Sequence, residues 1–167
     1  NRWCLGKPFE ACRQRAAPEN RAPAAVITVI QRVLRASVTV AGETTGAIGP
    51  GLLLLIGVER GDTAADADTT ARKVAALRCF PGRTPMDRTV GELGGGCLCV
   101  SQFTLAAELA EGNRPSFSAA ASPDLAEPLY LRVIEQLAAA GLTTARGRFG
   151  ASMAVDLCND GPVTFIL

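Results

Sequence analysis

The chain has 167 residues, of which 48% are hydrophobic and 20% are charged, and its formal net charge is +1. This length and composition predict one globular domain with a substantial core. No apolar run reaches the roughly 18 residues that a membrane span requires, so we expect a soluble protein without a membrane partner.

Residues 1–25 differ in composition from the rest of the chain. They contain three prolines, five basic residues and two acidic residues, and they show no sustained apolar periodicity. Transit peptides tend to be basic and poor in acidic residues, so this segment is interpreted either as a targeting-like extension or as a disordered one. We therefore expect the folded domain to span residues 26–167.

Short strands joined by turns are expected at the start of this domain. β-branched residues dominate Val26–Val33, and Ser37–Val40 alternates in the same way, which predicts two strands. A Gly-Glu turn leads into a further strand at Thr44–Ile48, and the apolar run Gly51–Val58 has the length of a buried strand. Together these segments predict a meander of antiparallel strands.

Two main helices are expected later in the chain. The first begins at Asp62 or Thr63 and has acidic residues in its first turns, an order that favours the helix dipole. The second begins at Ser122, carries Pro123 in its first turn, and ends at Gly141. Its apolar face is formed by Leu125, Leu129, Val133, Ile134 and Leu137.

The remaining segments complete an α+β pattern. Residues 81–96 are rich in proline and glycine and predict a loop, which is followed by a strand at Cys97–Leu105. The chain closes with strands around Val155–Cys158 and Val163–Leu167. Strands, helix, strand, helix and strands predict an α+β domain with a mostly antiparallel sheet.

The chain contains no histidine, which restricts the chemistry available to it. Neither a Ser-His-Asp nor a Cys-His arrangement is possible, and the commonest metal ligand is missing. Six cysteines are present, but none forms a Cys-x-x-Cys pair of the kind that binds zinc. We interpret them as structural thiols in a reducing compartment.

The segment Ser101-Gln102-Phe103-Thr104-Leu105 closes the predicted strand that begins at Cys97. At a strand end, backbone amides become free to point into a pocket, where they can stabilise the oxyanion of an acyl-transfer intermediate. Gln102 adds a neutral hydrogen-bond donor and acceptor, and Thr104 adds a hydroxyl, although no histidine is available to activate it. The alternative interpretation is the end of a core strand whose polar residues satisfy local backbone groups.

A second segment, Asn159-Asp160-Gly161-Pro162-Val163-Thr164, leads into the last predicted strand. Gly-Pro pairs are typical of tight turns, and the bond before a proline can be cis or trans. From these residues alone, a turn and a functional loop both remain open.

Together the two segments resemble SQFTL and NxGPVT, the signature motifs of the D-aminoacyl-tRNA deacylases. Their order and separation match that family, and the likeness extends over about residues 26–167. The opening strands from Val29 to Val40 contribute to it, as do the segments Gly112–Ser118 and Gly147–Met153. The resemblance implies a barrel-like sheet core with two main helices.

The resemblance also implies an activity, namely hydrolysis of the ester that joins a D-amino acid, or glycine, to the 3′ end of tRNA. In this family the SQFTL motif binds the terminal adenosine and the ester. Thr104 is then a nucleophile, or the 2′-hydroxyl beside the ester helps to activate water. No metal and no organic cofactor is implied. The substrate-site residues are expected to be Ser101, Gln102, Phe103, Thr104, Phe149, Met153, Arg114, Gly161 and Pro162.

In the family, the Gly-Pro bond is cis and is inserted into the pocket of a second subunit. Carried over to Gly161 and Pro162, this implies a homodimer in which the inserted backbone collides with an L side chain and tolerates a D side chain. A cytoplasmic proofreading enzyme, with tRNA as its partner, is therefore expected.

The distribution of charge departs from that expectation. From Val26 onward there are 12 basic and 14 acidic residues, a formal net charge of −2, whereas tRNA-binding surfaces are usually basic. Beside the D-aminoacyl-tRNA deacylase, two alternatives stay open: a related deacylase that edits a mischarged L-aminoacyl-tRNA, and a non-catalytic nucleic-acid-binding protein of the same fold. The basic residues that would have to cluster for tRNA binding are Arg32, Arg35, Arg72, Lys73, Arg114 and Arg148.

Overall fold

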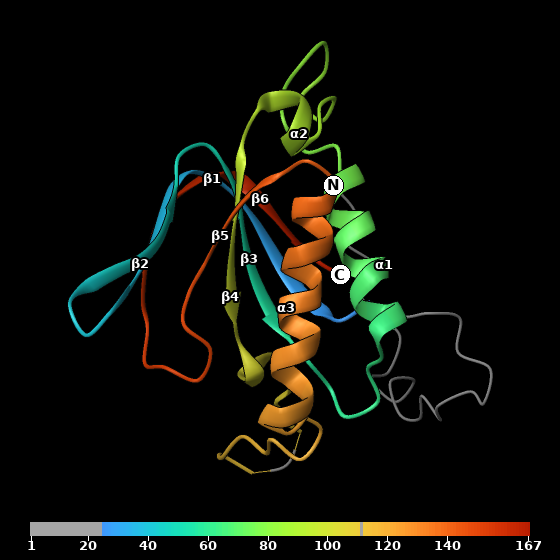
Figure 1. The fold of residues 1–167 in the computed structure, drawn as a ribbon, viewed down its shortest axis with the longest axis vertical. Coiled ribbons are helices and arrows are strands. Elements are labelled where there is room, and N and C mark those ends of the chain that lie inside the picture. Colours follow the sequence, from blue (N-terminus) through green and yellow to red (C-terminus); the bar gives the residue numbers. More distant parts are fainter. Residues whose placement is uncertain (1–24, 111) are drawn as a thin grey trace, which may run out of the picture.

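The computed structural model describes residues 25–110 and 112–167. The predicted extension therefore lies almost entirely outside the described residues. One sheet and two long helices dominate the fold, and α1 and α3 lie side by side over one face of the sheet (Figure 1). The strands are β1 (Ile27–Val40), β2 (Glu43–Ile48), β3 (Gly51–Gly57), β4 (Gly96–Ser101), β5 (Thr143–Arg146) and β6 (Ala154–Ile166). The helices are α1 (Ala64–Ala76), α2 (Val90–Leu93) and α3 (Pro123–Ala139), with the 3-10 helix η2 at Phe103–Ala106.

The sheet has the order β2-β1-β3-β4-β5, and β6 pairs with β1 outside this path. The pairings of β1 with β2, β3 and β6 are antiparallel, so the α+β prediction is confirmed. The β3–β4 and β4–β5 pairings are parallel, which the sequence analysis did not anticipate. Parallel neighbours need long crossovers, and these are supplied by α1 and α3.

Strand β1 is a single strand where two were expected. Its first half pairs with β3 up to Val33, and its second half pairs with β2 from Ala36 onward. The second half therefore carries β2 beyond the edge of the β3–β4–β5 layer. There the strands close toward a barrel, since a Cβ on Gly46 of β2 would lie only 2.6 Å from the carbonyl oxygen of Arg146 in β5.

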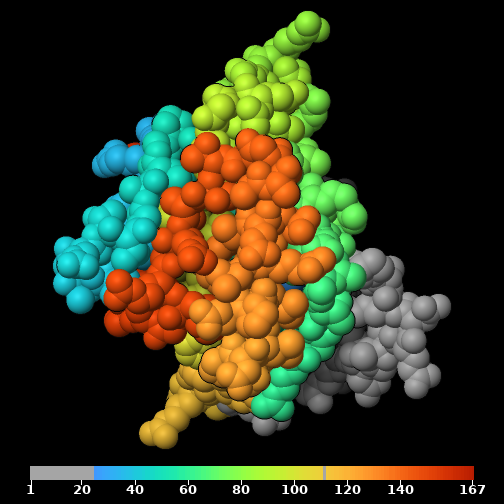
Figure 2. Space-filling view, viewed as in Figure 1, coloured from blue at the N-terminus to red at the C-terminus, as the bar shows by residue number. Residues whose placement is uncertain are grey.

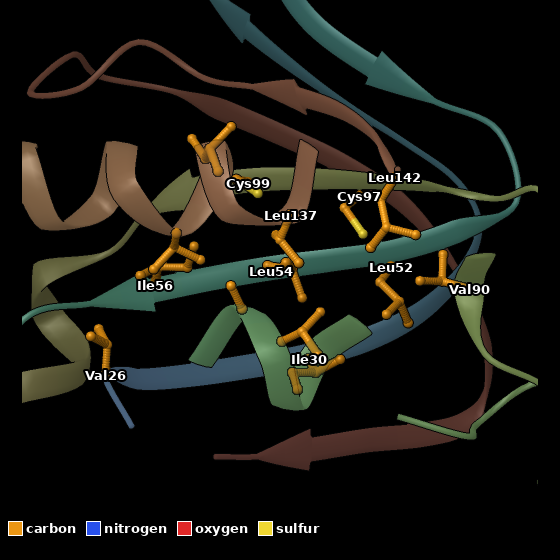
Figure 3. Packing of buried hydrophobic residues seen from close by; sticks show 14 of the residues in the cluster. Val26, Ile30, Leu52, Leu54, Ile56, Val90, Cys97, Cys99, Leu137 and Leu142 are labelled. Atoms are coloured by element: carbon orange, nitrogen blue, oxygen red, sulfur yellow. The ribbon is translucent and has the colours of Figure 1, made fainter. Parts of the chain in front are cut away.

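Both faces of the central strands are buried, which explains the unbroken run of leucines in β3. Leu52 and Leu54 face α1 and α3, in a cluster that also contains Ile30, Cys97 and Cys99 (Figure 3). The alternate residues fill a second cluster inside the barrel-like half, formed by Val33, Ala36, Val38, Leu53, Leu98 and Val100. The alternation follows directly from the two-residue period of a strand.

The helix starts agree with the local signals in the sequence. Thr63 is the N-cap of α1, and its backbone N–H donates to the Asp66 carboxylate at 2.9 Å. Ser122 is the N-cap of α3, and Pro123 occupies the first turn, where a missing N–H costs nothing. Leu125 was wrongly placed on the apolar face, since its side chain is 37% exposed.

Four segments differ locally from expectation. The helix α2 interrupts the predicted loop at 81–96, the predicted strand from Cys97 ends at Ser101, and β5 was not expected at all. The final two predicted strands form the single strand β6.

Within residues 25–110 and 112–167, no helix is long and apolar enough to cross a membrane.

Candidate active site

A pocket of about 560 Å³ lies beside the end of β4, between the first half of α3 and the segment that leads into β6. Five of the residues predicted for the site line it. The lining residues are Ile56, Val58, Val100, Ser101, Gln102, Phe103, Ala121, Pro123, Ala126, Tyr130, Phe149, Gly150, Ala151, Met153 and Val155. Pockets for small ligands are typically apolar with a few polar groups, and this lining has that composition.

The first motif changes from strand to helix at the edge of this pocket. The backbone N–H of Gln102 donates to the carbonyl of Ile56 at 2.7 Å, which extends the sheet by one residue. The short helix η2 then begins at Phe103. The first N–H groups of a helix have no partner within it. Among the described residues, no hydrogen bond engages the backbone N–H of Phe103 or Thr104.

Thr104 is held by its neighbour in the motif. The side-chain amide of Gln102 donates a hydrogen bond to the Thr104 hydroxyl oxygen. An amide is not a base, so this contact orients the hydroxyl without activating it for attack. Thr104 is exposed and does not line the pocket, whereas Ser101, Gln102 and Phe103 do.

Phe103 connects the motif to the loop that follows it. Its ring lies edge-on to Phe117, with 5.1 Å between the ring centroids, and its side chain is 58% exposed. Arg114 lies in the same loop, but it is exposed and does not line the pocket. Arg114 therefore lies outside the lining of this pocket, and the contact between Phe103 and Phe117 was not predicted from the sequence.

Tyr130 of α3 lines the pocket, although the sequence did not predict it as a site residue. Its hydroxyl donates a hydrogen bond to the carbonyl of Cys99 at 2.8 Å, and its ring centroid is 5.9 Å from that of Phe149. Burial raises the pKa of the Tyr130 hydroxyl well above its ordinary value, so this group stays protonated. The only sequence signal for this residue is that it is the sole tyrosine of the chain and lies in a predicted helix with an apolar face.

Phe149 and Met153 reach the pocket from the segment between β5 and β6. Gly147, at the start of this segment, is buried, and its N–H donates to the Cys99 carbonyl at 3.1 Å. A Cβ at Gly147 would lie 2.5 Å from the Met153 sulfur. The glycine therefore lets Met153 pack against the backbone, as the pocket wall requires.

The second motif lies outside this pocket. Opposite Arg32 of β1, the register of β6 jumps from Asn159 to Thr164, so the residues between them bulge from the ladder. Gly161 and Pro162 are exposed at this bulge, and the peptide bond between them is cis. Within one chain, the two motifs are therefore not brought together.

Arg32 fixes this bulge. Its Nε lies 2.9 Å from an Asp160 carboxylate oxygen and donates to the Asp160 carbonyl at 3.0 Å, and its Nη1 donates to the Cys79 carbonyl. The Arg32 side chain is only 12% exposed. It is therefore occupied within the protein, which removes it from the candidate phosphate ligands.

The remaining basic candidates are spread over four parts of the fold. Arg35 lies on β1, Arg72 and Lys73 lie on α1, Arg114 lies on the loop after η2, and Arg148 follows β5. The described part of the chain contains no group of His, Cys, Asp or Glu suited to a metal ion. Burial raises the pKa of Cys97 to about 12, so this thiol remains neutral.

Comparison with known proteins identifies the class to which this fold and site belong. The profile of the D-Tyr-tRNA(Tyr) deacylase family matches residues 29–167. A D-aminoacyl-tRNA deacylase from Syntrophotalea carbinolica is 56% identical over 140 residues, which cover 83% of this chain and 94% of the relative. One from Aeromonas hydrophila is also 56% identical, over 143 residues that cover 85% of this chain and 99% of the relative.

Two solved structures resemble the fold. One, described as a c-Myc DNA Unwinding Element Binding Protein, has a TM-score of 0.79 and 40% identity, and the match covers 84% of this chain and 97% of that one. The other, described as a probable eukaryotic D-amino acid tRNA deacylase, has a TM-score of 0.75 and 15% identity. That match covers 85% of this chain and 98% of the other chain. The second shows the shared fold alone.

The chain thus belongs to the D-Tyr-tRNA(Tyr) deacylase family. The family resemblance stated from the two motifs is confirmed, and with it the assignment to ester hydrolases. The roles of individual site residues stay predictions.

Proposed function

We propose that this protein is a proofreading enzyme of translation. It hydrolyses the ester of D-aminoacyl-tRNA, and also the ester of glycine that has been attached to the wrong tRNA. The observation that carries the proposal is the pair of unengaged backbone N–H groups, those of Phe103 and Thr104, at the start of η2, next to an apolar pocket that Phe103 lines. Such a pair is the arrangement that an oxyanion requires.

The terminal adenosine fits the aromatic part of the pocket. Phe149 and Met153 offer a face for a base, and Tyr130 closes the floor behind them. With the adenosine seated there, the ester carbonyl reaches the start of η2, where the two amides stabilise the charge that develops on its oxygen. Ser101 and Gln102 border the same position.

Water is the attacking group in this proposal. It adds to the ester carbonyl carbon, the bond from that carbon to the ribose oxygen breaks, and a proton passes to the ribose oxygen. The amino acid leaves as a free carboxylate. Because the chain has no histidine and Thr104 faces only an amide, the 2′-hydroxyl beside the ester is the group that best assists the water. This route requires no metal and no cofactor.

Chiral selection is assigned to Gly161 and Pro162 of a second copy of the chain. Both residues are exposed on a bulge outside their own pocket, where they are accessible to a partner. The backbone inserted by the partner would collide with an L side chain. A D side chain would point away from this backbone, and glycine has no side chain that could collide with it. A homodimer working in the cytoplasm, where translation proceeds, follows from this proposal.

The test compares D-Tyr-tRNA, L-Tyr-tRNA and glycyl-tRNA with the wild-type protein and a Gly161→Ala variant. A Cβ at Gly161 would lie 2.2 Å from the Asn159 side-chain nitrogen and 2.6 Å from the Val163 backbone nitrogen, so the bulge must shift. We expect the wild type to spare only the L ester and the variant to show a lower D/L ratio. Equal hydrolysis of D and L esters by the wild type would favour a related enzyme that edits L-aminoacyl-tRNA.

One comparison favours a second candidate function. The structural neighbour with 40% identity is described as a DNA unwinding element binding protein. The formal net charge of −2 from Val26 onward argues against tight DNA binding, since phosphate contacts supply most of such affinity. Titration of labelled duplex and single-stranded DNA at physiological salt decides the question, and saturable binding without ester hydrolysis would support the DNA-binding candidate.

A further inference from the structure

A second groove, of about 550 Å³, adjoins the candidate active site. The side chains of Tyr130 and Phe149 line both spaces, so these two residues border the groove and the pocket alike. The groove lies where the β1–β2 hairpin, α3 and the segment after β5 meet, on the face shown in Figure 2. Its polar side chains are those of Glu43, Thr44, Thr45, Glu127, Arg146 and Arg148.

Two arginines in this groove have no partner within the described residues. Neither Arg146 nor Arg148 takes part in an ion pair or a hydrogen bond through its side chain. By contrast, Arg32, Arg78 and Arg132 each pair with a carboxylate. The guanidinium group forms strong bidentate contacts with phosphate. These two arginines are therefore available to a bound anion.

Arg146 is the last residue of β5, Arg148 follows it by two residues, and both line this groove. They flank Gly147, which is buried and bonded to β4 through its N–H, while both arginines are exposed. The segment is thus fixed to the sheet at its middle residue. Two cations held on an anchored backbone present a site to a phosphodiester with little loss of backbone entropy.

Two carboxylates lie in the same groove, and they would repel a simple anion. Glu127 of α3 and Glu43 of the hairpin also form no ion pair among the described residues. A nucleotide satisfies both kinds of charge, because its phosphate is anionic and the exocyclic amine of cytosine donates hydrogen bonds. A glutamate accepting from the cytosine amine is an established pairing.

We propose that this groove binds the nucleotide that precedes the terminal adenosine of the tRNA, with Arg146 and Arg148 on the phosphodiester and Glu127 on the base. This inference rests on the proposed function, since it assumes that the neighbouring pocket holds the adenosine. It also explains how a domain with few basic residues could bind tRNA, because a few phosphate contacts close to the ester would replace a broad basic surface.

The experiment uses two short esters and the full chain. One is D-Tyr esterified to adenosine, and the other is D-Tyr esterified to the trinucleotide cytidylyl-cytidylyl-adenosine. We expect the wild type to prefer the trinucleotide ester, and the double variant Arg146→Ala/Arg148→Ala to lose roughly tenfold in kcat/KM on it. The adenosine ester, which does not reach the groove, should react with the variant within about twofold of the wild-type rate.

Salt dependence supplies a readout that a purely structural role would not move. Each phosphate contact with a single strand adds about 0.7 to the slope of log affinity against log salt, so the double variant should show a shallower slope on the trinucleotide. The matched control is Arg83→Ala, an exposed arginine on the loop before α2, and it should behave as the wild type.

A Glu127→Gln variant tests the contact with the base. The wild type should prefer cytidine to uridine at the position before adenosine, and the variant should lose that preference. Hydrolysis of the adenosine ester without any advantage for the trinucleotide would overturn the inference and leave the proposed function standing. Failure of the wild type to hydrolyse either ester would overturn both.

Discussion

The single tyrosine of the chain allows a sharp test of whether a buried hydroxyl is structural or catalytic. Tyr130 lines the candidate active site, yet its hydroxyl points to the Cys99 carbonyl at 2.8 Å. That carbonyl also accepts a hydrogen bond from the Gly147 N–H at 3.1 Å. Removing the hydroxyl therefore leaves no buried carbonyl without a partner.

We expect Tyr130→Phe to lower the free energy of unfolding by only about 1 kcal/mol, the net value of one intramolecular hydrogen bond. For a domain of this size, the corresponding fall in Tm is about 3–5 °C. Tyr130→Ala also removes the buried ring and should lower the free energy of unfolding by about 3–5 kcal/mol. Urea unfolding followed by circular dichroism measures both values.

The activity of the same variant decides the role of the hydroxyl. Because the hydroxyl faces the strand, Tyr130→Phe should retain kcat/KM for D-Tyr-tRNA within about twofold. A loss of a hundredfold or more in kcat by a folded Tyr130→Phe protein would show instead that the hydroxyl takes part in the chemistry. A loss of stability above about 3 kcal/mol would instead show that the Cys99 carbonyl depends on it alone.

Three further predictions follow from the packing. In Gly51→Ala the new Cβ would lie 2.0 Å from the Gly96 carbonyl oxygen, so we expect a loss of at least about 2 kcal/mol in the free energy of unfolding, measured in urea. In Gly57→Ala the Cβ would lie 2.8 Å from the Gln102 carbonyl oxygen, so deacylation should fall more steeply than stability; parallel loss of both would contradict a specific effect on the first motif. Burial raises the pKa of Cys97 to about 12, and the unfolded thiol titrates near its ordinary value of about 8.5. The unfolded state then releases a proton that the folded state retains, so stability should be complete below about pH 8.5 and fall as the pH rises toward 12. Cys97→Ala should flatten the fall in urea-measured stability between pH 8.5 and 10, and an unchanged slope would assign the fall to other groups.

Local signals explain why the starts of the helices could be predicted from the sequence. Thr63 and Ser122 cap their own helices, and Pro123 fits only the first turn, so each boundary is decided within a few residues. The continuity of β1 through Leu34 and Arg35 has no such signal. It depends on β6, which pairs with β1 along most of its length although it is far away in the sequence.

Some residues of the candidate site could likewise be predicted from local sequence, and others could not. Gln102 and Phe103 stand in a motif that can be read directly, and they line the pocket. Tyr130 carries no motif, because a lone aromatic on an apolar helix face looks like an ordinary core residue. Arg32 looked like a phosphate ligand in the sequence, yet it binds Asp160, 128 residues away, through a strand pairing that no local pattern reveals.

The most direct test that this pocket is the active site is to fill it with a larger side chain and measure hydrolysis of D-Tyr-tRNA. Ala126 is half-buried in the pocket wall on α3, so Ala126→Trp should occupy the space assigned to the adenosine. The matched control is Gln136→Trp, on an exposed position of the same helix. We expect Ala126→Trp to lose at least a hundredfold in kcat/KM while it stays folded, and Gln136→Trp to retain wild-type activity. Undiminished hydrolysis by folded Ala126→Trp would contradict the claim that this pocket is the active site.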